Sequence, residues 1–133
     1  MKLITRDSDY AIRALCYIAQ SGKETVSVSE LVDHLKIPKP FLRKLMQTLN
    51  KKGIVQSTKG AGGGFALVRN PRKISLAQII GVLQGGFTLN ECRFKKAPCP
   101  NVRECVLRAK ISAIEKRVYR ELNAIDLGSL CGQ

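Results

Sequence analysis

The sequence predicts a mainly α-helical fold with one small β-hairpin, and three observations support this fold class. Apolar residues recur with helical spacing over most of the 133-residue chain. A glycine-rich segment separates two β-prone runs near the middle, and a long helical pattern follows a cysteine-bearing stretch. Because 44% of the residues are hydrophobic, the chain can bury a core, which argues against disorder.

Two helices are expected before the first proline. Residues 8–19 have helical apolar spacing, and Ser21 and Gly22 end this helix. Ser27 and Glu30 have the spacing of a capping box, in which hydroxyl and carboxylate accept reciprocal backbone hydrogen bonds. A short helix therefore starts here and runs to about residue 35. The expected buried stripe of the first helix is Ile12, Leu15, Cys16 and Ala19.

Prolines separate this short helix from a third one. Pro38 and Pro40 cannot donate backbone hydrogen bonds and restrict the residues before them, so they interrupt the helix. Because proline is accepted in a first helical turn, a new helix is expected from about residue 39 to 52, capped by Gly53. Two helices joined by a tight turn are typical of a helix-turn-helix. The third helix should bury Leu42, Leu45, Met46 and Leu49.

A hairpin follows the third helix. Residues 54–59 and 65–69 are β-prone, and residues 60–64 supply the glycines of a tight turn. A nucleotide-phosphate loop is disfavoured because no Gly-Lys-Ser/Thr follows and the glycines lead into a strand. A plain surface hairpin remains an alternative. The helices and the hairpin together predict a winged helix-turn-helix.

Two further helices are expected, over residues 75–83 and 106–122. The last helix is long for a small domain, so its apolar stripe either packs on its own domain or, as we favour, pairs with a second subunit as a dimerisation helix. This organisation divides the chain into residues 1–84 (winged helix-turn-helix), 85–105 (cysteine-bearing loop) and 106–133 (dimerisation helix and tail). The two stripes are Leu76, Ile79, Ile80 and Leu83, and Ile111, Ile114, Val118 and Leu122.

The charge balance indicates a polyanionic partner. Lys and Arg number 23 against 10 Asp and Glu, which gives a net charge of +13, and residues 34–90 contain ten basic residues and no acidic one. Because this excess coincides with the predicted helix-turn-helix and hairpin, it favours double-stranded DNA over a membrane surface, although a solvated basic face is an alternative. No apolar run could span a bilayer and the N-terminus does not resemble a signal peptide, so a soluble, cytoplasmic protein is expected.

The third helix is the predicted recognition helix. Its N-terminal residues should reach base edges: Arg43 can donate twice to guanine, and Gln47 can pair with adenine. Lysines suit phosphates, and glycines let the wing approach the DNA backbone closely. For each residue, an ordinary exposed side chain is the alternative. The predicted DNA-binding residues are Lys39, Pro40, Arg43, Lys44, Gln47, Lys51, Lys59, Gly60, Gly62 and Gly63, with Lys52 as a further phosphate contact.

Three of the five cysteines, Cys92, Cys99 and Cys105, form a second constellation. Neighbouring lysines and arginines favour the thiolate form, which binds metal. An iron–sulfur cluster is favoured, although three cysteines are one short of the usual four ligands. Zinc and metal-free redox thiols remain alternatives.

The remaining candidate residues have plainer interpretations. Cys16 lies on an apolar stripe and is expected to be a core thiol, and Cys131 is expected to be a free tail thiol or an occasional ligand. His34, the only histidine, is expected at the surface. With one histidine and no paired carboxylates, acid–base catalysis has little support, so an enzyme is not expected.

The order of these motifs resembles the Rrf-two family of winged-helix transcription regulators, of the IscR, NsrR and RirA type. The matching segments are residues 1–3 and 9–12, residues 37–55, the wing at 59–67, residues 74–76 with 79–80, and the three cysteines before a long helix. The resemblance implies a homodimer joined through the long helix, which as a repressor binds a palindromic operator. It also implies an iron–sulfur cluster, 4Fe–4S or 2Fe–2S, that controls DNA affinity in response to iron–sulfur status, nitric oxide or redox stress.

The resemblance also suggests a fourth ligand. IscR-like members have a histidine three residues after the third cysteine, where this chain has Arg108, which cannot replace it. NsrR-like members can use an aspartate in the first helix of the partner subunit, and Asp9 occupies that position. The hypothesis is therefore ligation by Cys92, Cys99, Cys105 and Asp9. A metal-free regulator with thiol-based or no sensing, and a small iron–sulfur electron-transfer protein, are the rival functions.

Overall fold

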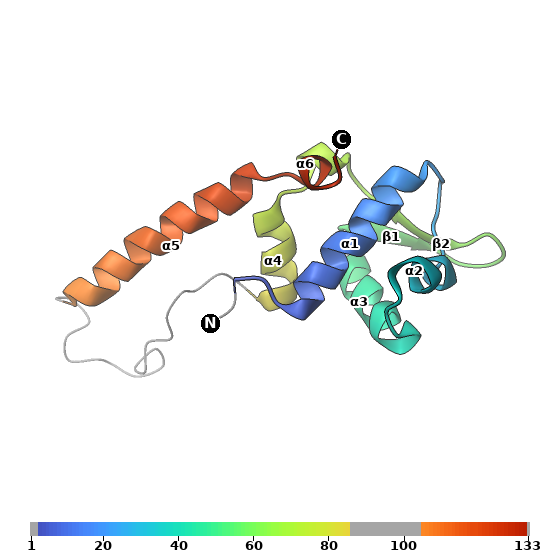
Figure 1. The fold of residues 1–133 in the computed structure, drawn as a ribbon, viewed down its shortest axis with the longest axis horizontal. Helices are drawn as coiled ribbons and strands as arrows, with labels where there is room; N and C mark the ends of the chain where they lie inside the picture. Colours follow the sequence, from blue (N-terminus) through green and yellow to red (C-terminus); the bar gives the residue numbers. More distant parts are fainter. Residues whose placement is uncertain (1–2, 86–104, 133) are drawn as a thin grey trace.

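The computed structural model describes residues 3–85 and 105–132. It confirms a mainly helical fold with one two-stranded hairpin (Figure 1). Within these residues, no helix is both long enough and apolar enough to cross a membrane. The elements are α1 (Arg6–Ser21), α2 (Val28–Leu35), α3 (Lys39–Lys51), β1 (Val55–Thr58), β2 (Gly64–Leu67), the 3₁₀ turn η1 (Pro71–Lys73), α4 (Leu76–Gln84), α5 (Val106–Ala124) and α6 (Leu127–Leu130).

The helix α1 is longer than the predicted 8–19 because both of its ends are capped. The Thr5 hydroxyl accepts a hydrogen bond from the Ser8 amide, and Gly22 ends the helix in the left-handed conformation, with φ of 69°. The buried face of α1 differs from the predicted stripe and contains more small residues. Ala11, Ala14, Leu15 and Ile18 are buried, whereas Ile12, Cys16 and Ala19 are only partly buried. The small residues allow neighbouring elements to approach α1 closely.

One main core joins the helix-turn-helix to the hairpin. The stripe predicted on α3 is entirely buried, with Leu42, Met46 and Leu49 fully inaccessible and Leu45 5% exposed. Val26, Leu31, Ile54 and Phe65 add side chains from the loop after α1, from α2 and from the hairpin. A well-packed core of this kind fixes the orientation of α3, and therefore which of its faces meets solvent.

The hairpin is antiparallel, with Val55 opposite Leu67 and Thr58 opposite Gly64. An isolated bridge between Val26 and Phe65 adds a short third segment to its edge. The two backbone hydrogen bonds of this bridge measure 2.9 and 2.8 Å between nitrogen and oxygen. The loop between α1 and α2 is therefore part of the same β-structure as the hairpin.

The long helix α5 extends away from the rest of the molecule (Figure 1). Among the described residues, it is the last turns of α5 that pack on the rest of the chain, where Leu122 joins a small cluster with Leu76, Ala77 and Ile80 of α4. Farther toward its N-terminus, Ile114 of the predicted stripe is 44% exposed. Leu107, which continues the stripe by one turn, is 65% exposed. Within residues 3–85 and 105–132, Leu122 is therefore the one buried member of the apolar stripe, and Ile111 and Val118 are partly buried.

The segment after α5 returns to the main core, which the sequence did not predict. Asp126 caps the short helix α6 by accepting the Ser129 amide, and Leu127 is fully buried. The Leu127 amide donates to the Ile74 carbonyl at 2.8 Å, and the Leu76 amide donates to the Ile125 carbonyl at the same distance. The C-terminal residues are thus packed beside α1 and η1.

Candidate nucleic-acid interface

The exposed face of α3 brings together five of the residues predicted to contact DNA. All five side chains are exposed, and together they line one hollow at the surface. They are Lys39, Pro40, Arg43, Lys44 and Gln47. Two lysines and an arginine around one hollow present a dense group of hydrogen-bond donors to an anionic partner.

The turn before α3 positions this face. Lys36 adopts the left-handed conformation, with φ of 59°, and its amide donates to the Val32 carbonyl at 2.8 Å. Ile37, which follows, is 4% exposed, so the turn is fixed to the core. Pro40 lies in the first turn of α3, where a missing amide proton costs nothing, and the Leu42 amide donates to the Pro38 carbonyl.

The wing is formed by β1, β2 and the glycine-rich turn between them. Gly62 has φ of 75°, which favours glycine, and Gly63 has no room for a Cβ because the Thr58 carbonyl oxygen lies in its place. Lys59, Gly60 and Gly62 are exposed, whereas Gly63 is half-buried. The wing tip therefore combines an exposed cation with backbone that can approach another molecule closely.

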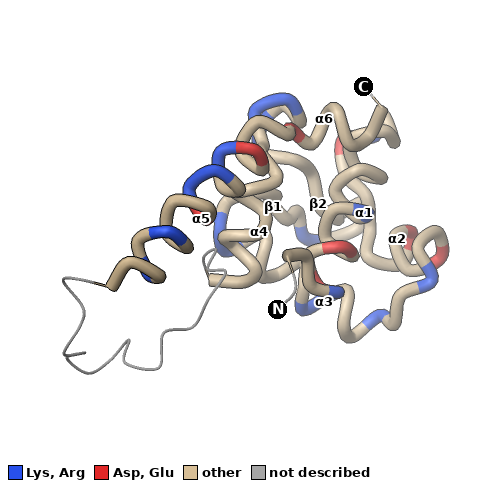
Figure 2. Tube along the Cα trace, turned by 60° about the vertical axis from the view of Figure 1, so that its left-hand side comes forward, with Lys and Arg blue, Asp and Glu red and all other residues tan. Residues whose placement is uncertain are grey.

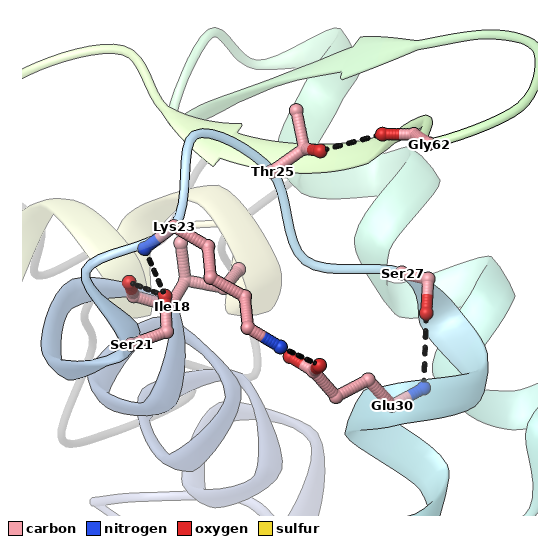
Figure 3. A network of polar contacts seen from close by, with 7 residues as sticks. All are labelled: Ile18, Ser21, Lys23, Thr25, Ser27, Glu30 and Gly62. Carbon is pink, nitrogen blue, oxygen red and sulfur yellow. Dashed lines mark hydrogen bonds and ion pairs between the residues drawn. The ribbon is translucent and has the colours of Figure 1, made fainter.

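The sequence did not predict the contact that holds the wing tip. The Thr25 hydroxyl, in the loop between α1 and α2, donates to the Gly62 carbonyl at 2.8 Å (Figure 3). Together with the Val26–Phe65 bridge, it ties the tip to the helix-turn-helix. A single threonine in a loop carries no sequence signal for a contact with a residue 37 positions away. The wing is thus supported at its tip as well as at its base.

The same loop is also tied to α2. The Ser27 hydroxyl accepts the Glu30 amide at 3.1 Å, as the predicted capping box requires, but the Glu30 carboxylate pairs with Lys23 (Figure 3). The hydrogen bond from Lys23 is the main reason that the pKa of Glu30 is lowered, and the same bond raises the pKa of Lys23. Both groups therefore stay charged at neutral pH.

Two helices each carry several basic residues. Lys and Arg occur on α3 and along α5 (Figure 2). Since residues 34–90 contain no Asp or Glu, the cations of α3 and the wing have no carboxylate partner from their own part of the sequence. The positive electrostatic potential of these cations can therefore attract a polyanion.

Only part of the predicted cluster site falls within the described residues. Cys92 and Cys99 lie outside them. Cys105 is a free thiol that caps the N-terminus of α5 and accepts the Arg108 amide at 3.4 Å. Asp9, in the first turn of α1, forms an ion pair with Arg13, with 3.0 Å between Oδ2 and Nε. Within residues 3–85 and 105–132, no three potential ligands gather as a metal site.

Two predictions about the remaining cysteines were wrong. Cys131 is not a free tail thiol, because it is 7% exposed and forms a disulfide with Cys16. Cys16 does pack against the main core, as predicted, but not as a free thiol. Disulfide connectivity cannot be deduced from sequence, and the two residues are 115 positions apart. His34 is exposed, as predicted, and its ring lies 4.3 Å from that of Tyr17.

Comparison with known proteins decides the family. A model of the Rrf2 family, described as iron-dependent transcriptional regulators, matches residues 4–133. The chain belongs to the Rrf2 family. The resemblance predicted from the sequence is therefore confirmed, and the chain is a transcriptional regulator of the winged-helix type rather than an enzyme.

Individual relatives agree with this assignment. Protein rrf2 of Nitratidesulfovibrio vulgaris is 34% identical over 131 residues, which cover 98% of this chain and 87% of that protein. CymR, the global cysteine regulator of B. subtilis, has a TM-score of 0.76 at 26% identity, covering 99% of this chain and 98% of CymR. IscR of T. potens has a TM-score of 0.73 at 27% identity, covering 98% and 85%.

Proposed function

We propose that this Rrf2-family chain acts in the cytoplasm as a homodimeric repressor. It binds a palindromic operator through α3 and the wing, and an iron–sulfur cluster controls its DNA affinity. The observation that carries the DNA-binding part is the hollow on α3, where Lys39, Arg43 and Gln47 lie together at the surface. Family membership supports the same function.

The side chains of α3 divide by their chemistry. Arg43 can donate two parallel hydrogen bonds to guanine O6 and N7, and Gln47, one turn later on the same exposed face, can pair with adenine. Lys44 and Lys51 are exposed point charges suited to phosphate oxygens. Lys59 and the glycine backbone of the wing would contact the DNA backbone beside the groove. The face thus offers both base readout and phosphate contacts.

The exposed stripe of α5 supports the homodimer. Leu107 and Ile114 are 65% and 44% exposed although they continue the stripe that ends at the buried Leu122. Large exposed apolar side chains in a row are typical of an interface. A second copy of α5 would cover them in a two-fold arrangement. Two-fold symmetry would in turn present both α3 helices to half-sites about one turn of DNA apart.

The described residues fit a cluster ligand at one position. Cys105 is the N-cap of α5, and its sulfur accepts a hydrogen bond from the Arg108 amide at 3.4 Å. Cys92, Cys99 and Cys105, with Asp9 of the partner subunit, would hold the cluster. When bound, the cluster supplies a group that reacts with oxidants or nitric oxide. Asp9 would exchange its surface pairing with Arg13 for this ligation.

Hydrogen bonds connect the end of α4, which precedes the cysteine-bearing segment, to the start of α1. Gln84, the last residue of α4, accepts the Ser8 hydroxyl at 2.7 Å, and the Thr5 amide donates to the same oxygen at 3.3 Å. Ser8 is fully buried, so this contact joins the end of α4 to the start of α1. α1 packs in turn against α3. A change in the segment that follows α4 would therefore reach the recognition helix through packed elements.

Anaerobic purification tests the cluster directly. The preparation should show visible absorption, with iron and acid-labile sulfide in stoichiometric amounts, and holo and apo protein should bind an operator duplex with different affinities. Asp9→Ala should alter the spectrum or the stability of the cluster, whereas Asp7→Ala, an exposed carboxylate two residues away, should not. Unchanged spectra and stability in Asp9→Ala would remove Asp9 from the ligand set. Equal operator affinity of holo and apo protein would reduce the chain to a constitutive binder.

A metal-free regulator with thiol-based sensing is the second candidate. It is favoured by the disulfide between Cys16 and Cys131, since this chain evidently carries thiols close enough to be oxidised without a metal. The similarity to CymR, a cysteine regulator, points in the same direction. Iron and sulfide in the purified protein would exclude this candidate. A colourless anaerobic preparation that still binds the operator would establish it.

A further inference from the structure

The disulfide between Cys16 and Cys131 joins two segments that are far apart in the sequence. Cys16 lies in the middle of α1, and Cys131 follows α6 at the C-terminal end of the chain. Their Cα atoms are 5.2 Å apart, within the range that a disulfide requires. The bond closes a loop of 115 residues that includes the recognition helix, the wing and α5.

Noncovalent contacts hold the two cysteines together independently of the bond. The Leu127 amide is hydrogen-bonded to Ile74, and the Cys131 amide donates to the Leu127 carbonyl at 3.0 Å. The side-chain amide of Gln20, one turn after Cys16, donates to the Cys131 carbonyl oxygen. Because these contacts do not involve sulfur, they would keep the thiols adjacent after reduction. Adjacent thiols can form the bond again.

The sulfur atoms of the pair are also accessible to a small reagent. Cys16 is only partly buried, and the buried Cys131 lies between the exposed Leu130 and Gly132. The helix α6 has four residues and opens more easily than the long helices do. A small oxidant can therefore reach the sulfur atoms without unfolding of the core.

This pair is separate from Cys105, the proposed cysteine ligand that lies within residues 3–85 and 105–132. Cys105 starts α5, whereas Cys131 follows its other end (Figure 1). The 19 residues of α5 span about 28 Å. Oxidation of the Cys16–Cys131 pair can therefore occur without exchange of thiols with Cys105.

We infer that Cys16 and Cys131 form a second, reversible redox site whose oxidant is a hydroperoxide. One thiolate attacks the peroxide oxygen, the O–O bond breaks and an alcohol leaves after protonation, which yields a sulfenic acid. The second thiol attacks this sulfur, its proton passes to the departing hydroxide, and water is released. In sum, two thiols and one hydroperoxide give a disulfide, an alcohol and water. A dithiol reductant restores both thiols and becomes a disulfide itself.

The bond locks the base of α5 to the DNA-binding part of the chain. In the oxidised state α1 is covalently attached to the segment that follows α5, while Leu122 anchors the last turns of α5 on α4. In the reduced state only the noncovalent contacts remain. If α5 joins two copies and α3 binds DNA, as proposed above, the lock restricts how the two recognition helices can move relative to each other. Only this consequence rests on the proposed function.

The test uses the full-length protein, reduced anaerobically and then treated with tert-butyl hydroperoxide. Nonreducing peptide mass analysis should show a cross-linked pair of peptides containing Cys16 and Cys131, which disappears after treatment with a dithiol under native conditions. The oxidised protein should have a Tm about 10 °C higher than the reduced protein, because the bond closes a long loop. Cys16→Ser and Cys131→Ser should each abolish the cross-linked pair and the Tm difference.

Cys131→Ser is the safer of the two variants because Cys131 follows α6, whereas Cys16 lies in the middle of α1. Cys105→Ser is the matched control that should keep the cross-link. Three outcomes would overturn the proposal: thiols that stay reduced in peroxide, a cross-link that joins other cysteines, or a bond that a dithiol reduces only after unfolding. All of these readouts are independent of DNA binding. Failure of the proposed regulator function would appear instead as a loss of operator binding with the thiol chemistry intact.

Discussion

The helices α3 and α5 carry similar patterns but bury them differently. Each is amphipathic and basic, and each has an apolar stripe at helical spacing. In α3 the whole stripe is buried by the same chain, with Leu45 the most exposed member at 5%. In α5 only Leu122 is buried, and Ile114 is 44% exposed. The same kind of pattern is therefore buried in the core in α3, whereas the described residues leave much of it exposed in α5.

The difference shows which surface of each helix is available for binding. Because the apolar face of α3 packs against the core, its polar face, with Arg43 and Gln47, is the surface that can bind a partner. Because α5 leaves its apolar face open, that face is the surface that can meet a partner. A basic polar face suits DNA, and an apolar stripe suits a second copy of the helix. Four substitutions test this contrast.

The largest effect is expected on the open stripe of α5. Ile114→Asp should weaken the homodimer by about 3–5 kcal/mol, because two-fold symmetry would bury an unpaired charge from each copy. Sedimentation equilibrium measures the change. Lys116→Gln is the control: it alters the net charge equally, and its exposed side chain lies on the opposite side of α5. A dimer that survives Ile114→Asp unchanged would show that the stripe is not the interface.

Substitution in the stripe of α3 should affect the stability of the fold rather than the dimer. Leu45→Ala should lower the free energy of unfolding by about 2–5 kcal/mol, since it leaves a cavity in the core. Leu107→Ala, made in the monomeric Ile114→Asp background, should change it by no more than about 0.5 kcal/mol because the side chain is exposed. Denaturant unfolding measures both. Similar losses at the two sites would mean that the chain itself covers the stripe of α5.

A smaller effect is expected on the polar face of α3. Arg43→Ala should weaken binding to the operator by about 1–3 kcal/mol and relax the base preference at one position. Folding should be unaffected because the side chain is exposed. Lys110→Ala, which removes an equal charge from α5, is the control for fluorescence anisotropy titrations. If both variants lose affinity equally on all sequences, Arg43 contributes only charge.

The smallest effect is expected where α5 returns to the core. The hydrogen bond from the Ser129 amide, 2.8 Å from the carboxylate, is the main reason that the pKa of Asp126 lies below its ordinary value of 3.8. The lowered pKa stabilises the fold above that ordinary value, and the contribution is lost as pH falls through the lowered pKa. Amide exchange at Cys131 should therefore speed up in acid relative to other helix ends. Asp126→Asn should remove the acid-dependent part, and if it does not, the cap is not responsible.

The elements that the sequence predicted well are those whose signal is local. Four apolar residues at helical spacing located the stripe of α3, and Gly53 marked its end, since its φ is 77°. The hairpin followed from β-prone runs around glycines. On α5, the stripe was visible but its burial was not, because burial depends on what packs against the helix. Periodicity alone cannot distinguish a core-facing stripe from an interface.

The features that escaped prediction depend on contacts between distant residues. A helix of four residues, such as α6, is too short to show a period. The support of the wing by Thr25 and the pairing of Cys16 with Cys131 join residues that are 37 and 115 positions apart. In the candidate site, residue types and exposure on α3 followed from the pattern. The joint hollow that those residues line is a property of the fold.

We propose that the exposed face of α3 binds duplex DNA. The most direct measurement is the affinity for an operator, selected from random duplexes, as a function of salt concentration, for the wild-type chain and for a variant with Arg43→Ala, Lys44→Ala and Gln47→Ala together. The log of the wild-type binding constant should fall linearly with log salt. In the variant the line should lie lower and be less steep, since a phosphate contact and base contacts are lost. Binding that is independent of salt, or equal in both proteins, would show that this face of α3 does not bind DNA.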